Sequence, residues 1–240
     1  MTSYNKTAVI TGAYGGLGKS LVNQYLRKGY NVHMIGRNKS RLLELEKHLK
    51  ILHSAATIKS YECDLADCHW VKDVCSMIKM ETNSIDVLIN CAAIFPVGSV
   101  CDTSIRSFER CMQINVTAPF VIVQQLLDHI KRSENGKVIN IASSSAYGGG
   151  PNTSAYCASK HALLGLSRSL FKELKTDGVK VFCVSPGSIQ TDMGKEVEKL
   201  GQIYETFMTP EEVSEYIFTA TSFNGHMISE EIRLNRVFVQ

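Results

Sequence analysis

The strongest constraint on the fold is an alternation of short apolar runs with longer helical patterns along the whole chain. The runs are rich in β-branched residues and most lack the polar alternation of a half-exposed strand, so we predict strands buried on both faces. They are TAVIT (7–11), NVHMI (31–35), IKSYEC (58–63), DVLIN (86–90), KVINIAS (137–143), KVFCVS (180–185) and IRLNRVFV (232–239). The helical patterns span roughly residues 16–28, 39–52, 67–80, 104–131, 154–176 and 210–221. This order predicts an α/β fold with one parallel sheet and helices on both of its faces.

The sequence gives no sign of a domain boundary. The chain has 240 residues, 5 prolines and 17 glycines spread among the turns, without a repeat or a long run of one charge. That length is sufficient for one substantial core, so we predict a single domain over residues 1–240. Residues 194–208 precede the last helical pattern and leave room for a short lid over a substrate, not for a second domain.

Charge and composition narrow the classes of partner. The 26 basic and 23 acidic residues are interleaved and sum to a formal charge of +3, so we expect neither a nucleic-acid nor a membrane partner. No basic leader and no stretch of 18 apolar residues is present, which indicates a soluble cytoplasmic protein. The eight cysteines lie in apolar runs, so we expect free thiols. Scattered histidines and the absence of CxxC or HExxH predict no metal site.

The segment GAYGGLGKS (12–20) has two interpretations. From Ala13 it fits a relaxed P-loop that ends in Gly18, Lys19 and Ser20 and would bind ATP or GTP. From Thr11 it reads TGxxxGxG, a glycine-rich turn for a dinucleotide. A P-loop enzyme also needs an acidic residue at the end of an apolar strand for Mg²⁺, and no convincing candidate is present. The dinucleotide is therefore favoured, and an ATP- or GTP-dependent enzyme remains a remote alternative.

A candidate catalytic pair lies in the helical pattern at 154–176. Tyr156 and Lys160 are four residues apart and therefore project from one face of the helix. A phenol with a neighbouring ammonium is a usable acid, because a nearby cation can lower the tyrosine pKa from about 10 towards the working range. Ser143 lies 13 residues upstream at the end of a predicted strand, and Asn115 lies further upstream.

These residues, in this order, resemble the short-chain dehydrogenase/reductase family. The resemblance covers nearly the whole chain: TGAYGGLG, Asp64 after the third strand, NCAA, Asn115, Ser143, Tyr156 to Lys160, and SPGSIQT. It implies a Rossmann-type, doubly wound parallel sheet of about seven strands that binds NAD(P). Family members have Asn-Asn-Ala-Gly where this chain has NCAA, which puts the local geometry in doubt. The C-terminal Asp-Gly-Gly of many relatives is also absent, so their subunit contacts transfer poorly.

The resemblance implies a role for each catalytic candidate. Tyr156 exchanges a proton with the substrate oxygen, and Ser143 hydrogen-bonds the same oxygen. Lys160 holds the nicotinamide ribose and lowers the tyrosine pKa, while Asn115 anchors a water that leads protons to Lys160. The groove-lining set expected for the cofactor includes the aromatic Tyr14, to which we assign no chemical role: Gly12, Tyr14, Gly15, Gly16, Leu17, Gly18, Arg37, Asp64, Leu65, Asn90, Ala92, Tyr156, Lys160, Pro186, Gly187, Ile189 and Thr191.

The choice of cofactor rests on the end of the second strand. Gly36 and Arg37 stand where an NAD-specific site offers an acidic side chain, and an arginine suits a 2′-phosphate. NADP(H) is therefore favoured, with NAD(H) possible. We expect reduction of a small-molecule carbonyl compound to an alcohol by a homodimer or homotetramer, and the sequence does not choose the substrate. A nucleotide-binding sensor or interaction protein with little turnover is the alternative.

Overall fold

The computed structural model describes residues 4–223, 225 and 227–237. Its centre is one sheet of seven parallel strands in the order β3-β2-β1-β4-β5-β6-β7. The strands are β1 (Lys6–Thr11), β2 (Tyr30–Gly36), β3 (Ile58–Glu62), β4 (Val87–Asn90), β5 (Lys137–Ile141), β6 (Lys180–Pro186) and β7 (Glu231–Leu234). The predicted doubly wound α/β fold is confirmed. The predicted seventh strand is shorter than expected, and its last residues, 238 and 239, lie outside the described residues.

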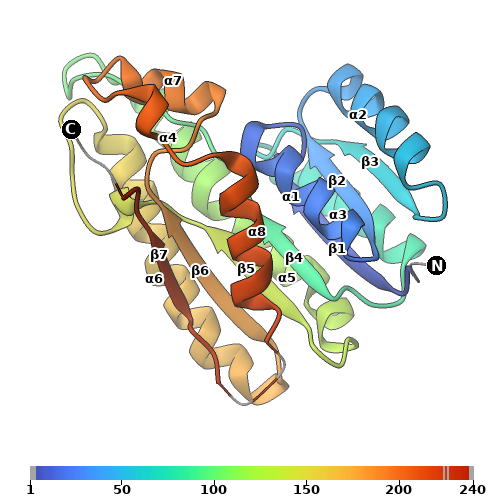
Figure 1. The fold of residues 1–240 in the computed structure, drawn as a ribbon. Coiled ribbons are helices and arrows are strands. Elements are labelled where there is room, and N and C mark those ends of the chain that lie inside the picture. Colours follow the sequence, from blue (N-terminus) through green and yellow to red (C-terminus); the bar gives the residue numbers. More distant parts are fainter. Residues whose placement is uncertain (1–3, 224, 226, 238–240) are drawn as a thin grey trace.

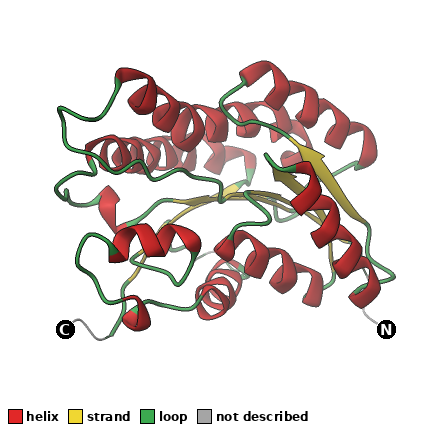
Figure 2. Ribbon diagram, turned by 90° about the horizontal axis from the view of Figure 1, so that it is seen from above, coloured by secondary structure: helices red, strands yellow, loops and turns green. Residues whose placement is uncertain are grey.

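Helices cover both faces of the sheet (Figures 1 and 2). They are α1 (Gly16–Arg27), α2 (Lys39–Leu52), α3 (Cys68–Glu81), α4 (Ile105–Met112), α5 (Ala118–Lys131), α6 (Ser154–Leu174), α7 (Asp192–Glu198) and α8 (Pro210–Thr221). Successive side chains of β1 alternate between the two faces, as a pleated strand requires. Ala8 and Ile10 pack in one core with residues of α1, α2 and α8, whereas Val9 packs in a second core with α3, α5 and α6.

The helical pattern at 104–131 is broken in the structure. Helix α4 ends at Met112, residues Gln113–Thr117 form a π-helical turn, and α5 follows. Pro119 has no N–H group and cannot form the usual bond to the carbonyl of Asn115, four residues earlier. The π-helical turn therefore lies where an uninterrupted α-helix would lack a hydrogen bond, and such turns are frequent at functional sites.

Three further observations concern the cysteines, metal binding and membrane-spanning helices. All eight cysteines are free, and five of them are buried. Within the described part of the chain, no group of three or more His, Cys, Asp or Glu side chains is arranged to hold a metal ion. None of the described helices has the length and apolarity needed to cross a membrane.

Candidate active site

A cavity of about 660 Å³ opens at the carboxyl ends of the strands, where the strand order reverses between β1 and β4. This is the expected ligand site of an open parallel sheet. It brings together nearly all the residues selected from the sequence: Gly12, Tyr14, Gly15, Gly16, Leu17, Gly18, Arg37, Asp64, Leu65, Ala92, Ser143, Tyr156, Lys160, Pro186, Gly187, Ile189 and Thr191. Asn90 and Asn115 are not among the lining residues.

The side chain of Asn90 belongs to the sheet and not to the cavity. It is 2% exposed and pairs in register with Asn140 on β5, to which its Nδ2 donates a hydrogen bond of 2.8 Å. Asn140 in turn donates to Ser167 on α6 at 2.9 Å. The Nδ2 of Asn90 is therefore engaged by the neighbouring strand, and the expected role of Asn90 in cofactor binding stays a prediction.

Asn115 is a buried connector. Its Nδ2 donates to the Ile94 carbonyl and to Ser159 Oγ, both at 3.0 Å, and its Oδ1 accepts from the Ile94 N–H at 2.9 Å. These bonds join the π-helical turn to the loop after β4 and to α6. The side chain thus positions the two segments that carry cavity residues, while its predicted role as a water anchor stays a prediction.

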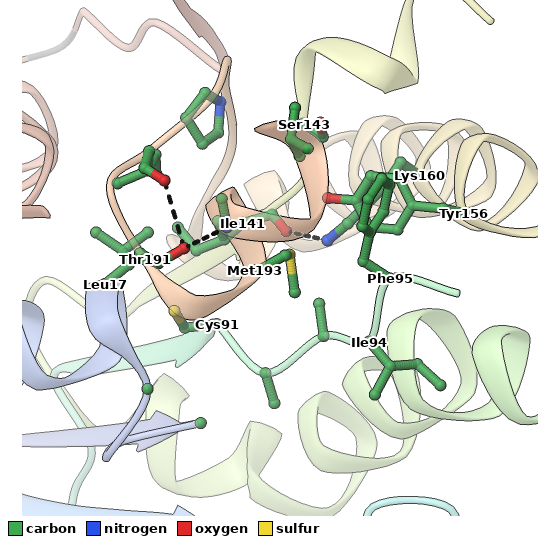
Figure 3. A pocket seen from close by; sticks show the side chains of 18 of the residues that line it. Leu17, Cys91, Ile94, Phe95, Ile141, Ser143, Tyr156, Lys160, Thr191 and Met193 are labelled. Carbon is green, nitrogen blue, oxygen red and sulfur yellow. Dashed lines mark hydrogen bonds between the residues drawn. The ribbon is translucent and has the colours of Figure 1, made fainter. Parts of the chain in front are cut away.

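The three remaining catalytic candidates meet in the cavity (Figure 3). Tyr156 and Lys160 project from neighbouring turns of α6, and Ser143 follows β5. The Lys160 Nζ lies 5.6 Å from the centroid of the Tyr156 ring and donates to the Ile141 carbonyl at 2.7 Å. All three side chains are buried, with Tyr156 only 7% exposed. The predicted grouping of phenol, hydroxyl and ammonium is present in this geometry.

Burial controls the electrostatics of this group. It raises the pKa of Tyr156 to about 12, and the interaction with the Ser143 hydroxyl acts in the lowering direction. It lowers the pKa of Lys160 to about 8. We expect Lys160 to lower the tyrosine pKa, but the net shift of Tyr156 runs the other way because lost hydration outweighs the neighbouring groups. The lowering effect of Lys160 on the pKa of Tyr156 stays a prediction.

The glycine turn joins β1 to α1 at the opposite end of the cavity. Gly12 has a φ of +68°, which few side chains adopt, and a Cβ on Gly18 would lie 2.0 Å from the Gly12 carbonyl oxygen. Helix α1 begins at Gly16, and its N-cap, Gly15, offers no side chain to the free N–H groups. The turn thus presents a helix N-terminus to the cavity, as the binding of a phosphate group requires.

Lys19 does not take part in this arrangement. It is exposed on α1 and lies outside the set of residues that line the cavity. A P-loop lysine must reach the β- and γ-phosphates of its nucleotide. The position of Lys19 therefore contradicts the ATP or GTP interpretation of the glycine turn.

Two arginines form a cationic rim of the cavity near the carboxyl end of β2. Arg37 and Arg41 are both exposed, and both line the cavity. The Cζ of Arg41 lies 4.7 Å from the centroid of the Tyr14 ring, whose hydroxyl accepts a 3.2 Å hydrogen bond from the Asn38 N–H. A Cβ on Gly36 would lie 2.5 Å from the same ring. Sequence reasoning missed Arg41, because its contact with Tyr14 exists only in the folded chain.

Asp64 lines the cavity beside this rim, but its carboxylate already has partners. Burial by itself raises the pKa of Asp64, yet hydrogen bonds from Arg110 and the Ala66 N–H hold it below its usual value. The Arg110 Nη2 lies 3.2 and 2.9 Å from the two carboxylate oxygens. Asp64 therefore stays ionised and is held in place by α4.

The segment expected to form a lid, 194–208, contributes fewer side chains than we expect from the sequence. Within it Gly194, Val197, Leu200 and Gln202 line the cavity, whereas Phe207 and Met208 are buried in the protein core. The short helix α7, absent from the predicted elements, carries Val197. The sequence also missed apolar lining residues outside this segment, among them Met193, which directly precedes it, and Phe95, which follows β4.

Comparison with known proteins identifies the family of the chain. The model of the short chain dehydrogenase family matches residues 6–200. The chain therefore belongs to the short-chain dehydrogenase/reductase family, and it is an oxidoreductase of the class that acts on CH–OH or C=O groups.

Three similar proteins illustrate the relationship. A 3-oxoacyl-[acyl-carrier-protein] reductase of Rickettsia conorii is 29% identical, and the alignment covers 96% of this chain and 95% of the relative. A 3alpha-hydroxysteroid dehydrogenase of Mediterraneibacter gnavus is 31% identical over 79% of this chain and 76% of the relative. The structure of a blue fluorescent protein from a metagenomic library, in complex with NADPH, has a TM-score of 0.87 and 25% identity over 98% of both chains.

Proposed function

We propose that the protein is an NADPH-dependent reductase that converts a ketone or aldehyde to an alcohol, with Tyr156 as the proton donor. The observation that carries the proposal is the meeting of Tyr156, Ser143 and Lys160 in the same cavity as the glycine turn and the arginine rim. This arrangement places an acid and a phosphate-binding turn at the two ends of one groove.

The cofactor assignment rests on charge and shape. The α1 N-terminus suits a pyrophosphate, and Arg37 with Arg41 suits a 2′-phosphate. Arg37 follows β2 where an acidic residue would favour NAD(H). The blue fluorescent protein, which was solved with NADPH, supports the same cofactor. NAD(H) remains the alternative, and it would gain support if NADH bound as tightly as NADPH.

The chemistry of reduction explains the three polar side chains. NADPH, when bound, supplies the hydride that adds to the carbonyl carbon. Negative charge then develops on the carbonyl oxygen, and hydroxyl donors held near that oxygen stabilise the transition state more than the ground state. Ser143 and Tyr156 are such donors, and Tyr156 gives up its proton as the alcohol forms.

Lys160 and Asn115 complete this scheme. A buried ammonium next to the phenol compensates the phenolate that remains after proton transfer, and it can bind a ribose hydroxyl. Asn115 fixes α6 through Ser159. We propose that the backbone carbonyl of Asn115, to which Pro119 cannot donate, accepts a hydrogen bond from a water that returns a proton to Lys160.

The relatives support chemistry at a carbonyl or alcohol carbon, because one is named for a 3-oxo group and the other for a 3α-hydroxy group. We also propose that the enzyme works in the cytoplasm as a homodimer or homotetramer, with residues 194–208 as a short lid. A cofactor-binding protein with little turnover is the second candidate. Its sign would be NADPH binding without reduction of any carbonyl compound.

The test is a titration of the purified protein with NADPH, NADH and ATP, followed by a panel of ketones and aldehydes monitored by NADPH consumption. The proposal expects the tightest binding for NADPH and a reduction rate that Tyr156→Phe lowers by about 10²-fold or more. Preference for ATP, or near-wild-type reduction by Tyr156→Phe, would overturn it.

A further inference from the structure

Three consecutive glycines lie in the loop between Ser143 and Tyr156, and packing against a neighbour is found only at Gly150, where a Cβ would lie 3.3 Å from Thr153 Oγ1. None of Gly148, Gly149 and Gly150 has the positive φ that Gly12 has. A Cβ added to Gly148 or Gly149 would meet no atom within 4 Å, whereas a Cβ on Gly18 would collide with the backbone. The glycines leave open space, and all three are exposed and line the cavity.

The same cavity has an apolar lining beside Tyr156. The Phe95 ring packs edge-on against the Tyr156 ring, with 4.6 Å between centroids and an angle of 85°. Ile94 and Met193, both labelled in Figure 3, also line the cavity. Val197 and Leu200 of the lid segment extend the apolar lining. A flat or ring-shaped group would therefore find both apolar contact and free room in this cavity.

The charges of the cavity lie away from this space or are already engaged. Arg37, Arg41 and Asp64 cluster around β2 and β3, at the end that we assign to the adenosine part of the cofactor. At the Tyr156 end, Lys160 is 2% exposed and donates to the Ile141 carbonyl. Asp192 is the other charged lining residue there, and its side chain is 87% exposed and paired with Lys195. Among the described residues that line the cavity, the cations are Arg37, Arg41 and Lys160, so an anionic group beside Ser143 and Tyr156 would meet no lining cation other than the buried Lys160.

We propose that the substrate is an uncharged, bulky ring ketone whose ring system lies over Gly148–Gly150 while its carbonyl faces Ser143 and Tyr156. The reduction of the carbonyl group rests on the proposed function, whereas the size, ring shape and lack of charge of the substrate do not. Apolar contact area scales with substrate size, so a fused-ring ketone gains binding energy that a small ketone cannot gain. A carboxylate near the reacting carbonyl would lose its hydration without gaining a partner.

Four carbonyl compounds test this assignment as two matched pairs. trans-2-Decalone and cyclohexanone differ in bulk, and ethyl benzoylformate and benzoylformate differ in charge. We expect kcat/KM to be about tenfold or more higher for decalone than for cyclohexanone. We expect a difference of at least about tenfold for the ester over the carboxylate. Equal values within either pair would overturn the proposal.

A binding measurement separates this inference from the proposed function. Calorimetric titration of decalone and cyclohexanone into the wild-type protein with NADP⁺ requires no turnover. Saturable binding that is about tenfold tighter for decalone supports the inference even if no ketone is reduced, in which case the proposed reductase activity alone is wrong. Absence of saturable decalone binding, or equal affinity for the two ketones, overturns the inference.

Variants test whether the open space at Gly148 and Gly149 causes the preference for bulky ketones. Gly149→Leu should lower the affinity for decalone and its kcat/KM by about tenfold or more, with a loss for cyclohexanone at least fivefold smaller. Gly165→Leu is the matched control, because Gly165 lies on α6 outside the cavity and its Cβ would also meet no atom within 4 Å. Size-exclusion chromatography and thermal unfolding check the assembly and fold of both variants, and Gly148→Leu replaces Gly149→Leu if the latter does not fold.

Gly149→Ala distinguishes space from backbone freedom. Alanine restricts the loop nearly as much as leucine but fills little of the cavity. An effect on decalone clearly smaller than that of Gly149→Leu supports a steric role. Equal losses with alanine and leucine, for both decalone and cyclohexanone, would show that the glycines serve as a hinge and would overturn the proposal.

Discussion

The guanidinium of Arg41 lies over the ring of Tyr14, with its Cζ 4.7 Å from the ring centroid. This cation–π contact holds the charge at the cavity rim while leaving N–H donors free for a ligand. Arg37 lines the same part of the cavity. The two arginines therefore form one cationic site beside the glycine turn, and this site is suited to the 2′-phosphate of NADPH.

Arg41→Gln should weaken NADPH binding by about three- to tenfold and NADH binding by less than twofold. The loss is modest because Arg41 is exposed and solvent screens its charge. Fluorescence titration measures both cofactors, and adenosine 2′,5′-bisphosphate against AMP isolates the phosphate contact. Lys47→Gln, on the same helix and outside the cavity, is the control. An equal loss for NADPH and NADH would remove Arg41 from the phosphate site.

Gly36→Ala should also weaken NADPH binding several-fold, although it removes no charge. The added Cβ would lie 2.5 Å from Cε1 of Tyr14, so the ring must move and the support beneath Arg41 is lost. Gly165→Ala adds the same group where it meets nothing. The same titration checks both variants, and unchanged NADPH affinity for Gly36→Ala would show that the ring is not needed.

Lys19→Ala should change NADPH affinity by less than twofold. Lys19 is exposed on α1 and does not line the cavity, so its removal leaves the N–H groups of the glycine turn in place. The measurement is a titration with NADPH and with ATP. Loss of NADPH and ATP binding by a folded Lys19→Ala variant would instead support the P-loop interpretation.

The features that were predictable from the sequence depend on local order. Buried apolar runs specify the parallel strands, and the glycine turn follows β1 directly. The spacing of Ser143, Tyr156 and Lys160 places all three at one end of the sheet, because each lies just after a strand or early in α6. Helical periodicity likewise gave α2 and α8 with the bounds that the structure has.

The features that sequence reasoning missed depend on distant contacts. The hydrogen bond from the Nδ2 of Asn90 to Asn140 joins neighbouring strands that are far apart in the sequence. In the sequence Arg41 is one of several cations, and only the fold brings it over the ring of Tyr14. The direction of the Tyr156 shift follows from burial, which spacing along a helix does not determine. In contrast, the break near Asn115 had a local sign in Pro119, four residues later.

Lys160→Met should raise the free energy of unfolding more at pH 8 and below than at pH 10.5. Burial lowers the pKa of Lys160 from 10.5 to about 8, which corresponds to about 3 kcal/mol. Between these values the unfolded chain binds the proton and the folded chain does not, so wild-type stability rises with pH. The advantage of Lys160→Met should therefore shrink by about 3 kcal/mol between pH 8 and pH 10.5.

Urea unfolding of both proteins at several pH values measures this difference, and the titration of other groups cancels in the comparison. The lost hydrogen bond to the Ile141 carbonyl offsets part of the gain at every pH without changing its pH dependence. A stability difference that stays constant from pH 8 to pH 10.5 would show that the ammonium is not desolvated.

Tyr156→Phe should bind NADPH nearly as the wild type does and lose most carbonyl reduction at every pH where the fold persists. The substitution keeps the ring, its edge-on contact with Phe95 and the whole glycine turn, and it removes only the hydroxyl. Proton donation of this kind is worth roughly 10² to 10⁴ in rate, so we expect a loss of that size or larger in kcat.

Single-turnover kinetics at saturating NADPH tests the role of the Tyr156 hydroxyl, because it separates the chemical step from cofactor binding and product release. Ser143→Ala is the companion variant: it keeps the acid and removes one donor to the carbonyl oxygen, so its loss should resemble the roughly 10²- to 10³-fold cost of one oxyanion-hole donor. Because burial raises the pKa of Tyr156 to about 12, the wild-type phenol stays protonated at neutral pH and is a proton donor there. Near-wild-type reduction by Tyr156→Phe would require a different acid, even with the family assignment intact.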